Sequence, residues 1–238
     1  METELNFLSA GDQSLVIELG KSIDLELNQK IRDLTSSIEQ KSIPGIIELI
    51  PSYRSILINF DANVISIPKL KNLFSDLYLN LKNAKLPKPK TIEIPTLFAG
   101  KYGPDIEFVA RNAKLTIQEV ISVYTNNIYP ICMIGFTPGF PYLQGLDQRL
   151  STPRLKTPRT SVNPGSVGIA DNQTGIYPVK SPGGWQIIGR TPLKLFSPNN
   201  KNPFIFNIGD NIKFTSILNE KEFSNIEKNM NLIEENEI

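Results

Sequence analysis

Two copies of the tripeptide Thr-Pro-Arg lie five residues apart, at Thr152–Arg154 and Thr157–Arg159. A planar guanidinium group binds a carboxylate or a phosphate through paired hydrogen bonds. Proline stiffens the backbone just before each arginine, so less entropy is lost when the side chain binds. We therefore predict that Arg154 and Arg159 bind an anion, either a substrate carboxylate or a phosphate. The alternative is a structural role, in which the guanidinium groups bridge loop carbonyls.

The segment around these repeats, residues 135–195, combines rigid turns with an excess of positive charge. It holds nine of the fifteen glycines, eight of the eighteen prolines, and seven basic side chains against two carboxylates, those of Asp147 and Asp171. Large aromatic residues are spaced through it, which indicates packed turns between short strands, because disordered segments lack them. With so few acidic residues in the segment, we expect an anionic ligand to complete the charge balance of Arg159.

Two further groups of candidate residues lie in this segment. One group could line the same ligand site as the arginines: Gln173, Tyr177 and Arg190. The other group forms a rigid aromatic turn, which we predict to be a pocket wall or a protein interface, with core packing an equally supported alternative: Pro138, Phe140 and Tyr142.

Several kinds of catalytic site are excluded by composition. The chain contains no histidine, so it cannot hold a Ser-His-Asp triad, a Cys-His pair or a histidine-based metal site. Its one cysteine, Cys132, lies in an apolar run and is expected to be buried and inert. Asp147 and Asp171 each lie in a turn, where a carboxylate more often hydrogen-bonds its own backbone than acts as a base. We predict no metal site and no complete catalytic set in this chain alone.

The octapeptide from Gly184 to Thr191 comes close to a phosphate-binding loop, with arginine where lysine is required. The four residues between its two glycines are large and strand-forming, so their amides could not wrap around a phosphate. We interpret this stretch as a β-strand. We expect ATP and Mg²⁺ to be bound by an assembled complex, in which any ATP contact from this chain would come from its arginines and turn amides, jointly with another chain.

The overall charge and the N-terminal sequence limit the partners and the location. Lysine and arginine number 25 and acidic residues 24, and the net charge of +1 argues against nucleic-acid binding. No stretch has the pattern of a signal peptide or the length of a membrane span. With a single cysteine that cannot form an internal disulfide, these features lead us to expect a cytoplasmic protein.

The hydrophobic periodicity predicts an α+β protein of two domains. Residues 1–86 are predicted to form the first domain, with strand-like runs on both sides of Pro51–Tyr53, helical spacing before and after them, and a strand before the first helix. A further strand around Ile92, just beyond these residues, completes the order. This βαββαβ order indicates a ferredoxin-like domain. We place a linker at Lys85–Lys90, where two prolines and three lysines interrupt the pattern.

Residues 87–218 are predicted to form the second domain. A capping box at Thr116–Glu119 opens a helix, and many short strands separated by glycine and proline turns follow from Tyr129 onward. Such spacing indicates a closed or nearly closed β-barrel. The acidic residues 219–238 are expected to be a terminal helix or a frayed tail.

Four motifs carry a family resemblance: GFTPGFPYLQGLD from Gly135, TPRLKTPRTSVNPGSVGIA from Thr152, QTGIYPVKSPGGWQIIGRTP from Gln173, and the closing LKLFSP from Leu193. They resemble the family that contains the B subunit of bacterial 5-oxoprolinase, the sporulation-kinase inhibitor KipI and allophanate hydrolase subunit 1. The resemblance implies that the barrel is cyclophilin-like. Members of the family often carry a histidine near the position of Tyr124, and this chain has none.

The resemblance also implies two classes of function. The favoured one is a non-autonomous subunit of an ATP-hydrolysing enzyme, which opens 5-oxoproline to glutamate together with the A and C subunits of 5-oxoprolinase. The C subunit would be the closest partner. The alternatives are a KipI-like inhibitor that binds a sensor histidine kinase, and half of a module of the urea-carboxylase or allophanate-hydrolase type.

Overall fold

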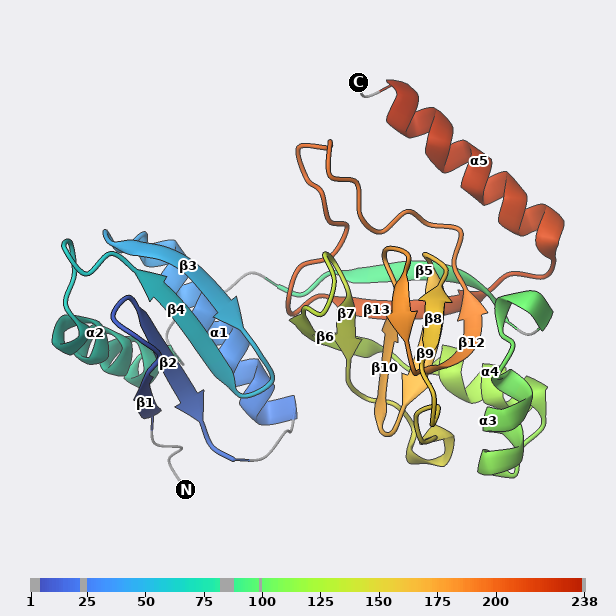
Figure 1. The fold of residues 1–238 in the computed structure, drawn as a ribbon, viewed down its shortest axis with the longest axis horizontal. Helices are drawn as coiled ribbons and strands as arrows, with labels where there is room; N and C mark the ends of the chain where they lie inside the picture. The colour runs from blue at the N-terminus through green and yellow to red at the C-terminus, as the bar shows by residue number, and fades with distance from the viewer. Residues whose placement is uncertain (1–4, 22–24, 82–87, 99, 237–238) are drawn as a thin grey trace. The chain divides into compact units, whose positions relative to one another are not determined.

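The computed structural model describes residues 5–21, 25–81, 88–98 and 100–236, with side chains described as far as residue 229. The contacts between Cα atoms divide the chain into two compact units, Met1–Lys88 and Pro89–Ile238. Figure 1 labels most of the helices and strands of both units. The predicted linker at Lys85–Lys90 falls partly on residues 85–87, which lie outside the described residues, and it stays a prediction.

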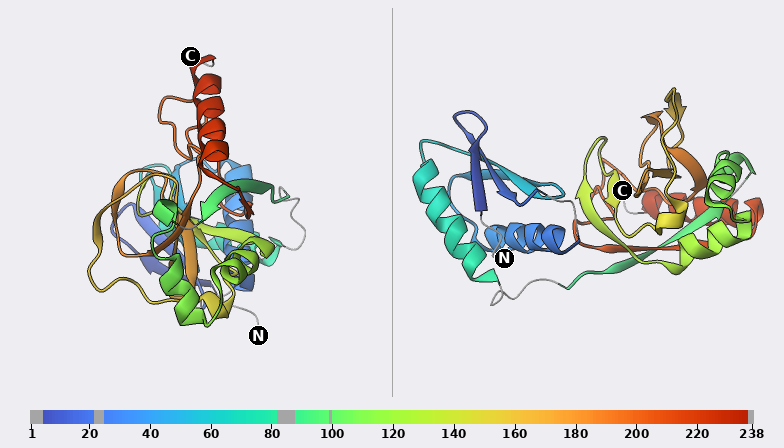
Figure 2. Two further views of the ribbon diagram at one scale, coloured as in Figure 1. Left: turned by 90° about the vertical axis from the view of Figure 1, so that its right-hand side faces the viewer. Right: turned by 90° about the horizontal axis from the view of Figure 1, so that it is seen from below.

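The N-terminal unit is a four-stranded antiparallel sheet with two helices. Its strands follow the order β1-β2-β4-β3 across the sheet, and Figure 2 shows both helices on the same face of it. Every second residue of β2 and β4 is buried against these helices, which explains the alternating sequence pattern. The elements are β1 (Leu5–Ser9), β2 (Ser14–Leu19), α1 (Leu25–Lys41), β3 (Ile46–Pro51), β4 (Ser55–Phe60) and α2 (Ile67–Leu79).

The order of these elements is ββαββα, so the predicted βαββαβ order is wrong. The strands on both sides of Pro51–Tyr53 are confirmed, but a hairpin, β1–β2, precedes the first helix, with Gly11 in its turn at φ 101°. The strand around Ile92 is β5 (Thr91–Phe98), and it pairs with β13 (Asn211–Ser216) in the second unit. Hydrophobic alternation shows that a strand exists but does not show which sheet it joins.

The second unit contains a closed barrel, which confirms that part of the prediction. Seven strands follow one another around it in the order β10-β7-β6-β13-β5-β12-β9. A separate two-stranded sheet, β11-β8, accompanies the barrel. The remaining strands are β6 (Tyr129–Ile134), β7 (Pro141–Leu143), β8 (Arg159–Val162), β9 (Ser166–Ala170), β10 (Gln173–Ile176), β11 (Ser181–Gly183) and β12 (Gln186–Arg190).

Helices cover parts of this barrel. The predicted capping box is confirmed, because the Thr116 hydroxyl accepts from the amide of Glu119 and the Glu119 carboxylate accepts from the amide of Thr116. The predicted terminal helix is present as α5. The aromatic ring of its Phe223 is buried beside Leu97. The helices are α3 (Ile106–Ala113), α4 (Ile117–Asn126), α5 (Glu220–Asn236) and the short 3₁₀ turns η2 (Gly100–Tyr102) and η3 (Gln148–Leu150).

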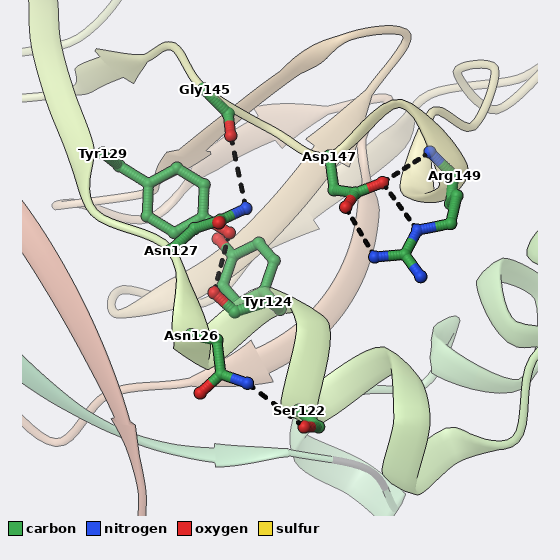
Figure 3. A network of polar contacts seen from close by, with 8 residues as sticks. All are labelled: Ser122, Tyr124, Asn126, Asn127, Tyr129, Gly145, Asp147 and Arg149. Atoms are coloured by element: carbon green, nitrogen blue, oxygen red, sulfur yellow. Dashed lines mark hydrogen bonds and ion pairs between the residues drawn. The ribbon is translucent and has the colours of Figure 1, made fainter.

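A buried polar chain fastens α4 to the barrel. The Tyr124 hydroxyl lies 2.6 Å from the Oγ1 of Thr174 on β10, and Thr174 donates to the carbonyl of Gly168 on β9. The Tyr129 hydroxyl donates to the carbonyl of Tyr124 at 2.7 Å (Figure 3). Because burial raises the pKa of Tyr124 well above its usual value, this phenol is neutral and serves as a structural anchor.

Across the described residues, no helix combines the length and the apolar composition that crossing a bilayer requires.

A tight turn at Gly165 joins β8 to β9, and we predict that it tolerates no side chain. Gly165 has φ +80°, and an added Cβ would overlap the carbonyl oxygen of Thr191. Replacing it with alanine should lower the free energy of unfolding by about 2 kcal/mol or more, through backbone strain and this overlap. The measurement is chemical denaturation of the purified chain.

Gly135→Ala is the matched control for this substitution, because its Cβ would meet nothing closer than 3.9 Å and its φ is not positive. We expect its midpoint to stay near that of the unsubstituted chain. Equal effects of the two substitutions would contradict the assignment of strain to Gly165.

Candidate functional site

Four aromatic side chains meet beside the two-stranded sheet, and we call them the aromatic cluster: Phe140, Tyr142, Tyr177 and Trp185. Phe140 lies at the centre, with ring centroids 4.9 Å from Tyr142, 5.0 Å from Tyr177 and 5.4 Å from Trp185. The edge-to-face contacts that Phe140 makes with Tyr177 and Trp185 are a favoured geometry for aromatic rings. Phe140, Tyr177 and Trp185 are buried, whereas Tyr142 is only partly buried and forms part of the cluster's surface.

Arg154 lies over this cluster with its guanidinium accessible. Its Cζ is 5.9 Å from the centroid of the Trp185 ring, and its side chain is 55 % exposed. The Nε lies 3.4 Å from a carboxylate oxygen of Asp171, which is itself 61 % exposed. An ion pair this exposed contributes little to stability, so the guanidinium can exchange Asp171 for another anion.

The backbone around Arg154 is held in place, as the Thr-Pro-Arg pattern predicts. Thr152 and Asp171 exchange two backbone hydrogen bonds, at 3.2 and 2.7 Å. The amide of Leu155 donates to the carbonyl of Gly184 at 2.8 Å, and the side chain of Gln186 donates to the carbonyl of Pro153 at 2.8 Å. Arg154 therefore projects from a fixed loop.

Arg159 has a different environment, and its charge is balanced within the chain. Its Nη2 donates to both carboxylate oxygens of Asp105, at 2.7 and 2.8 Å, and its Nη1 donates to the carbonyl of Trp185 at 3.2 Å. The expectation that an anionic ligand completes the charge balance of Arg159 is wrong. Asp105 lies thirty residues before the segment 135–195, and only the folded structure brings it to this arginine.

Asp105 is the residue of this region that the sequence did not reveal. Besides Arg159, its carboxylate accepts from the backbone amide of Ile187 at 2.6 Å, and its own amide donates to the carbonyl of Ile187 at 2.9 Å. It stands at the N-cap of α3, where a carboxylate also interacts favourably with the helix dipole. The sequence signal was a Gly-Pro-Asp turn before a helix, which does not identify the partner.

The two tyrosines of the cluster are neutral hydrogen-bonding groups. Burial raises the pKa of Tyr177 to about 12, against the opposing effect of a hydrogen bond from the Trp185 backbone. Burial also raises the pKa of Tyr142, and the nearby Arg154 opposes that rise. At neutral pH both phenols keep their protons, so they can donate hydrogen bonds but are poor bases.

The other predicted site residues lie apart from Arg154 or at its margin. Gln173 opens β10 and is half-buried. Arg190 ends β12, where its Nε donates to the carbonyl of Pro164 and its guanidinium lies 5.7 Å from the ring of Phe223 on α5. Pro138 is exposed in the turn before Phe140. The structure thus brings five of the predicted residues together with Trp185: Phe140, Tyr142, Arg154, Arg159 and Tyr177.

Several interpretations of individual residues are confirmed. The stretch resembling a phosphate loop forms β12, and Cys132 is buried. Asp147 binds the amide and guanidinium of Arg149 (Figure 3), and these hydrogen bonds lower its pKa to about 2. The expectation of no metal site stays a prediction; among the described residues, no three cysteine, aspartate or glutamate side chains are grouped so that they could hold a metal ion.

Removing the Asp105 carboxylate should loosen the attachment of β8 and β12. We expect Asp105→Asn to lower the free energy of unfolding by about 1.5–3 kcal/mol, because the partly buried Arg159 loses its charged partner. Denaturation followed by the emission of Trp185, the only tryptophan, would measure this. Asp147→Asn, which breaks the more exposed pair with Arg149, should cost less than about 1 kcal/mol. Equal costs would contradict a special role for Asp105.

The raised pKa of Tyr177 should make the fold sensitive to alkali. The unfolded phenol ionises near its usual pKa of about 10, whereas the folded one remains neutral up to about 12. The contribution of the neutral Tyr177 phenol to the free energy of unfolding is therefore fully present below about pH 10. It is lost as the pH rises from there toward 12. Tyr177→Phe should flatten this loss in unfolding curves recorded between these two pH values. An unchanged slope would show that other tyrosines account for it.

The chain is similar in sequence to a known protein family and to several of its named members. Residues 5–206 match the family described as the carboxyltransferase domain, subdomain C and D. The chain is 38% identical over 223 residues to the 5-oxoprolinase B subunit of Bacillus subtilis, covering 90% of this chain and 92% of that one. It is 34% identical over 205 residues to the 5-oxoprolinase B subunit of Escherichia coli O157:H7, covering 86% and 92%.

A solved structure of similar sequence also matches nearly the whole chain. A conserved uncharacterized protein from Pyrococcus horikoshii is 41% identical, with a TM-score of 0.55 over 92% of this chain and 100% of that one. The match to the carboxyltransferase-domain family spans both units of the chain, and the relatives are covered almost end to end. The chain therefore belongs to the carboxyltransferase-domain family, subdomains C and D, and within it to the group of the 5-oxoprolinase B subunits.

Proposed function

We propose that this chain is the B subunit of an ATP-dependent 5-oxoprolinase, active only together with the A and C subunits. The enzyme would convert 5-oxoproline, ATP and water into glutamate, ADP and phosphate in the cytoplasm. Support comes from the two relatives that are named as 5-oxoprolinase B subunits and that match this chain over 92% of their own length. The chain's own side chains agree with a partial role, because the described residues offer an anion-binding group without a nucleophile-and-base pair beside it.

The observation that carries the proposal is the accessible guanidinium of Arg154 over the Trp185 ring. The substrate 5-oxoproline is a flat, five-membered lactam with one carboxylate. An arginine matches that carboxylate with two hydrogen bonds, and the partly exposed Tyr142 borders the same position. Arg154 would thus bind and orient the substrate through its carboxylate and leave the lactam bond to groups on a partner chain.

Arg159 and Tyr177 have supporting roles in this proposal. Arg159, fixed by Asp105, holds the Trp185 carbonyl and so sets the position of the aromatic cluster. Tyr177 remains protonated and packs, buried, against Phe140 of the cluster. Neither residue needs to change its protonation state during the reaction.

ATP and Mg²⁺ are assigned to another chain of the complex. Within the described part of this chain, the one stretch resembling a phosphate loop is a barrel strand, and no carboxylate group is arranged to hold a metal ion. The residues present therefore do not fit an ATP–Mg²⁺ site. Pro138 is the exposed member of the predicted interface group, and the nearby Phe136, which is 61 % exposed, would extend this surface toward a partner.

Arg154→Ala should weaken 5-oxoproline binding by about tenfold or more, because a charged hydrogen-bonding partner of the carboxylate is lost. Binding to the isolated chain can be followed by the emission of Trp185, and 5-oxoproline-dependent ATP hydrolysis by the complex with the A and C subunits. Arg154→Lys should also be impaired, because an ammonium group cannot reproduce the paired hydrogen bonds.

Arg149→Ala is the matched control, since Arg149 is also an exposed arginine paired with an aspartate and lies outside the aromatic cluster. It should bind and turn over 5-oxoproline like the unsubstituted chain. If Arg154→Ala retains full affinity and full activity in the complex, the proposed site is wrong. Turnover by the isolated chain would contradict the need for partners.

A further inference from the structure

The N-terminal unit contains a groove between α1 and α2 that the proposed function does not use. Its volume is about 930 Å³, at the upper end of the range of small-ligand sites. The groove is open to solvent, and Val64 on its wall is 55 % exposed. Its apolar lining comes from both helices and from the loops beside them: Ile43, Pro44, Val64, Ile65, Leu73 and Leu77.

One polar group in the lining is buried without a partner. Ser37 on α1 is 6 % exposed, and no described atom makes a hydrogen bond with its Oγ. By contrast, the hydroxyl of Thr35, two residues earlier, donates to the carbonyl of Ile31 at 2.8 Å. A buried hydroxyl without a partner is costly, and a ligand with a polar atom could satisfy it.

The charges around the groove favour an anion. Lys41 ends α1 and Lys69 lies in the first turn of α2, and neither forms an ion pair with a described residue. Among the lining residues, Asp76 is the one carboxylate. Lys69 also lies at the N-terminus of a 13-residue helix, where the helix dipole adds positive potential.

Together these features describe the chemistry of the occupant. The walls require apolar surface, and the two lysines require a negative group. An amphipathic helix with an apolar side chain against Ser37 would leave its hydroxyl unsatisfied. A slender aliphatic chain with a terminal carboxylate suits the apolar walls, the two lysines and the Ser37 hydroxyl.

We propose that the groove between α1 and α2 binds an aliphatic carboxylate. The chain of the ligand lies along Leu73 and Leu77, and its carboxylate interacts with Lys41, Lys69 and the hydroxyl of Ser37. This site is independent of the aromatic cluster, which belongs to the other unit of the chain.

The test uses isothermal titration of the full chain with decanoate, kept below its micellar concentration, and with decanol. We expect saturable one-to-one binding of decanoate and weaker binding of decanol. The double variant Lys41→Gln/Lys69→Gln should weaken decanoate by about five- to tenfold, as expected for two exposed ion pairs, and leave decanol unchanged. Ser37→Ala should weaken decanoate without lowering the thermal midpoint, because the hydroxyl has no partner to lose within the protein.

Lys71→Gln is the control for the lysine variants, because Lys71 is on α2 but does not line the groove. It should bind decanoate like the unsubstituted chain. The proposal is overturned if decanoate does not bind saturably, or if decanol binds equally well. Binding confined to vesicles of phosphatidylglycerol and phosphatidylcholine, with none to free decanoate, would overturn it in favour of a membrane-docking surface. The comparison of the two ligands needs no variant, so it stands even if a substituted chain fails to fold.

Discussion

The ion pair between Asp105 and Arg159 is the interaction on which the arrangement of the candidate site depends. One carboxylate binds the guanidinium from β8 and the backbone amide of Ile187 on β12, and the same arginine binds the carbonyl of Trp185. Three elements distant in sequence, α3, β8 and β12, are thereby joined at one point. Because a partly buried charge without its partner is costly, this geometry has few alternatives.

The two Thr-Pro-Arg repeats illustrate how environment divides the roles of identical motifs. Arg159 has a partly buried, two-oxygen partner and serves the fold, whereas Arg154 has only the exposed and more distant carboxylate of Asp171. Arg159 is therefore held by an ion pair within the protein, whereas Arg154 is available to a ligand. The difference lies in which carboxylate the fold brings near, since the local sequences are almost the same.

The fold was predictable where the signal is local. The capping box at Thr116, the strands on both sides of Pro51–Tyr53 and the barrel's short strands all follow from turn chemistry and periodicity. The assignment of β5 failed because a strand of alternating pattern can join either of two sheets. The hairpin at Gly11 was missed because β1 is only five residues long and mostly exposed, so its pattern is weak.

By itself, the sequence determined the kinds of group available: arginines on stiff loops, an aromatic turn, and no histidine, which excludes several catalytic mechanisms. It also determined the family, because long motifs persist through the loop-rich segment. Only the tertiary structure decided which arginine remains accessible and which is neutralised by Asp105, a residue 54 positions away in the chain. Charge balance depends on distance in space, and composition counts charges without placing them.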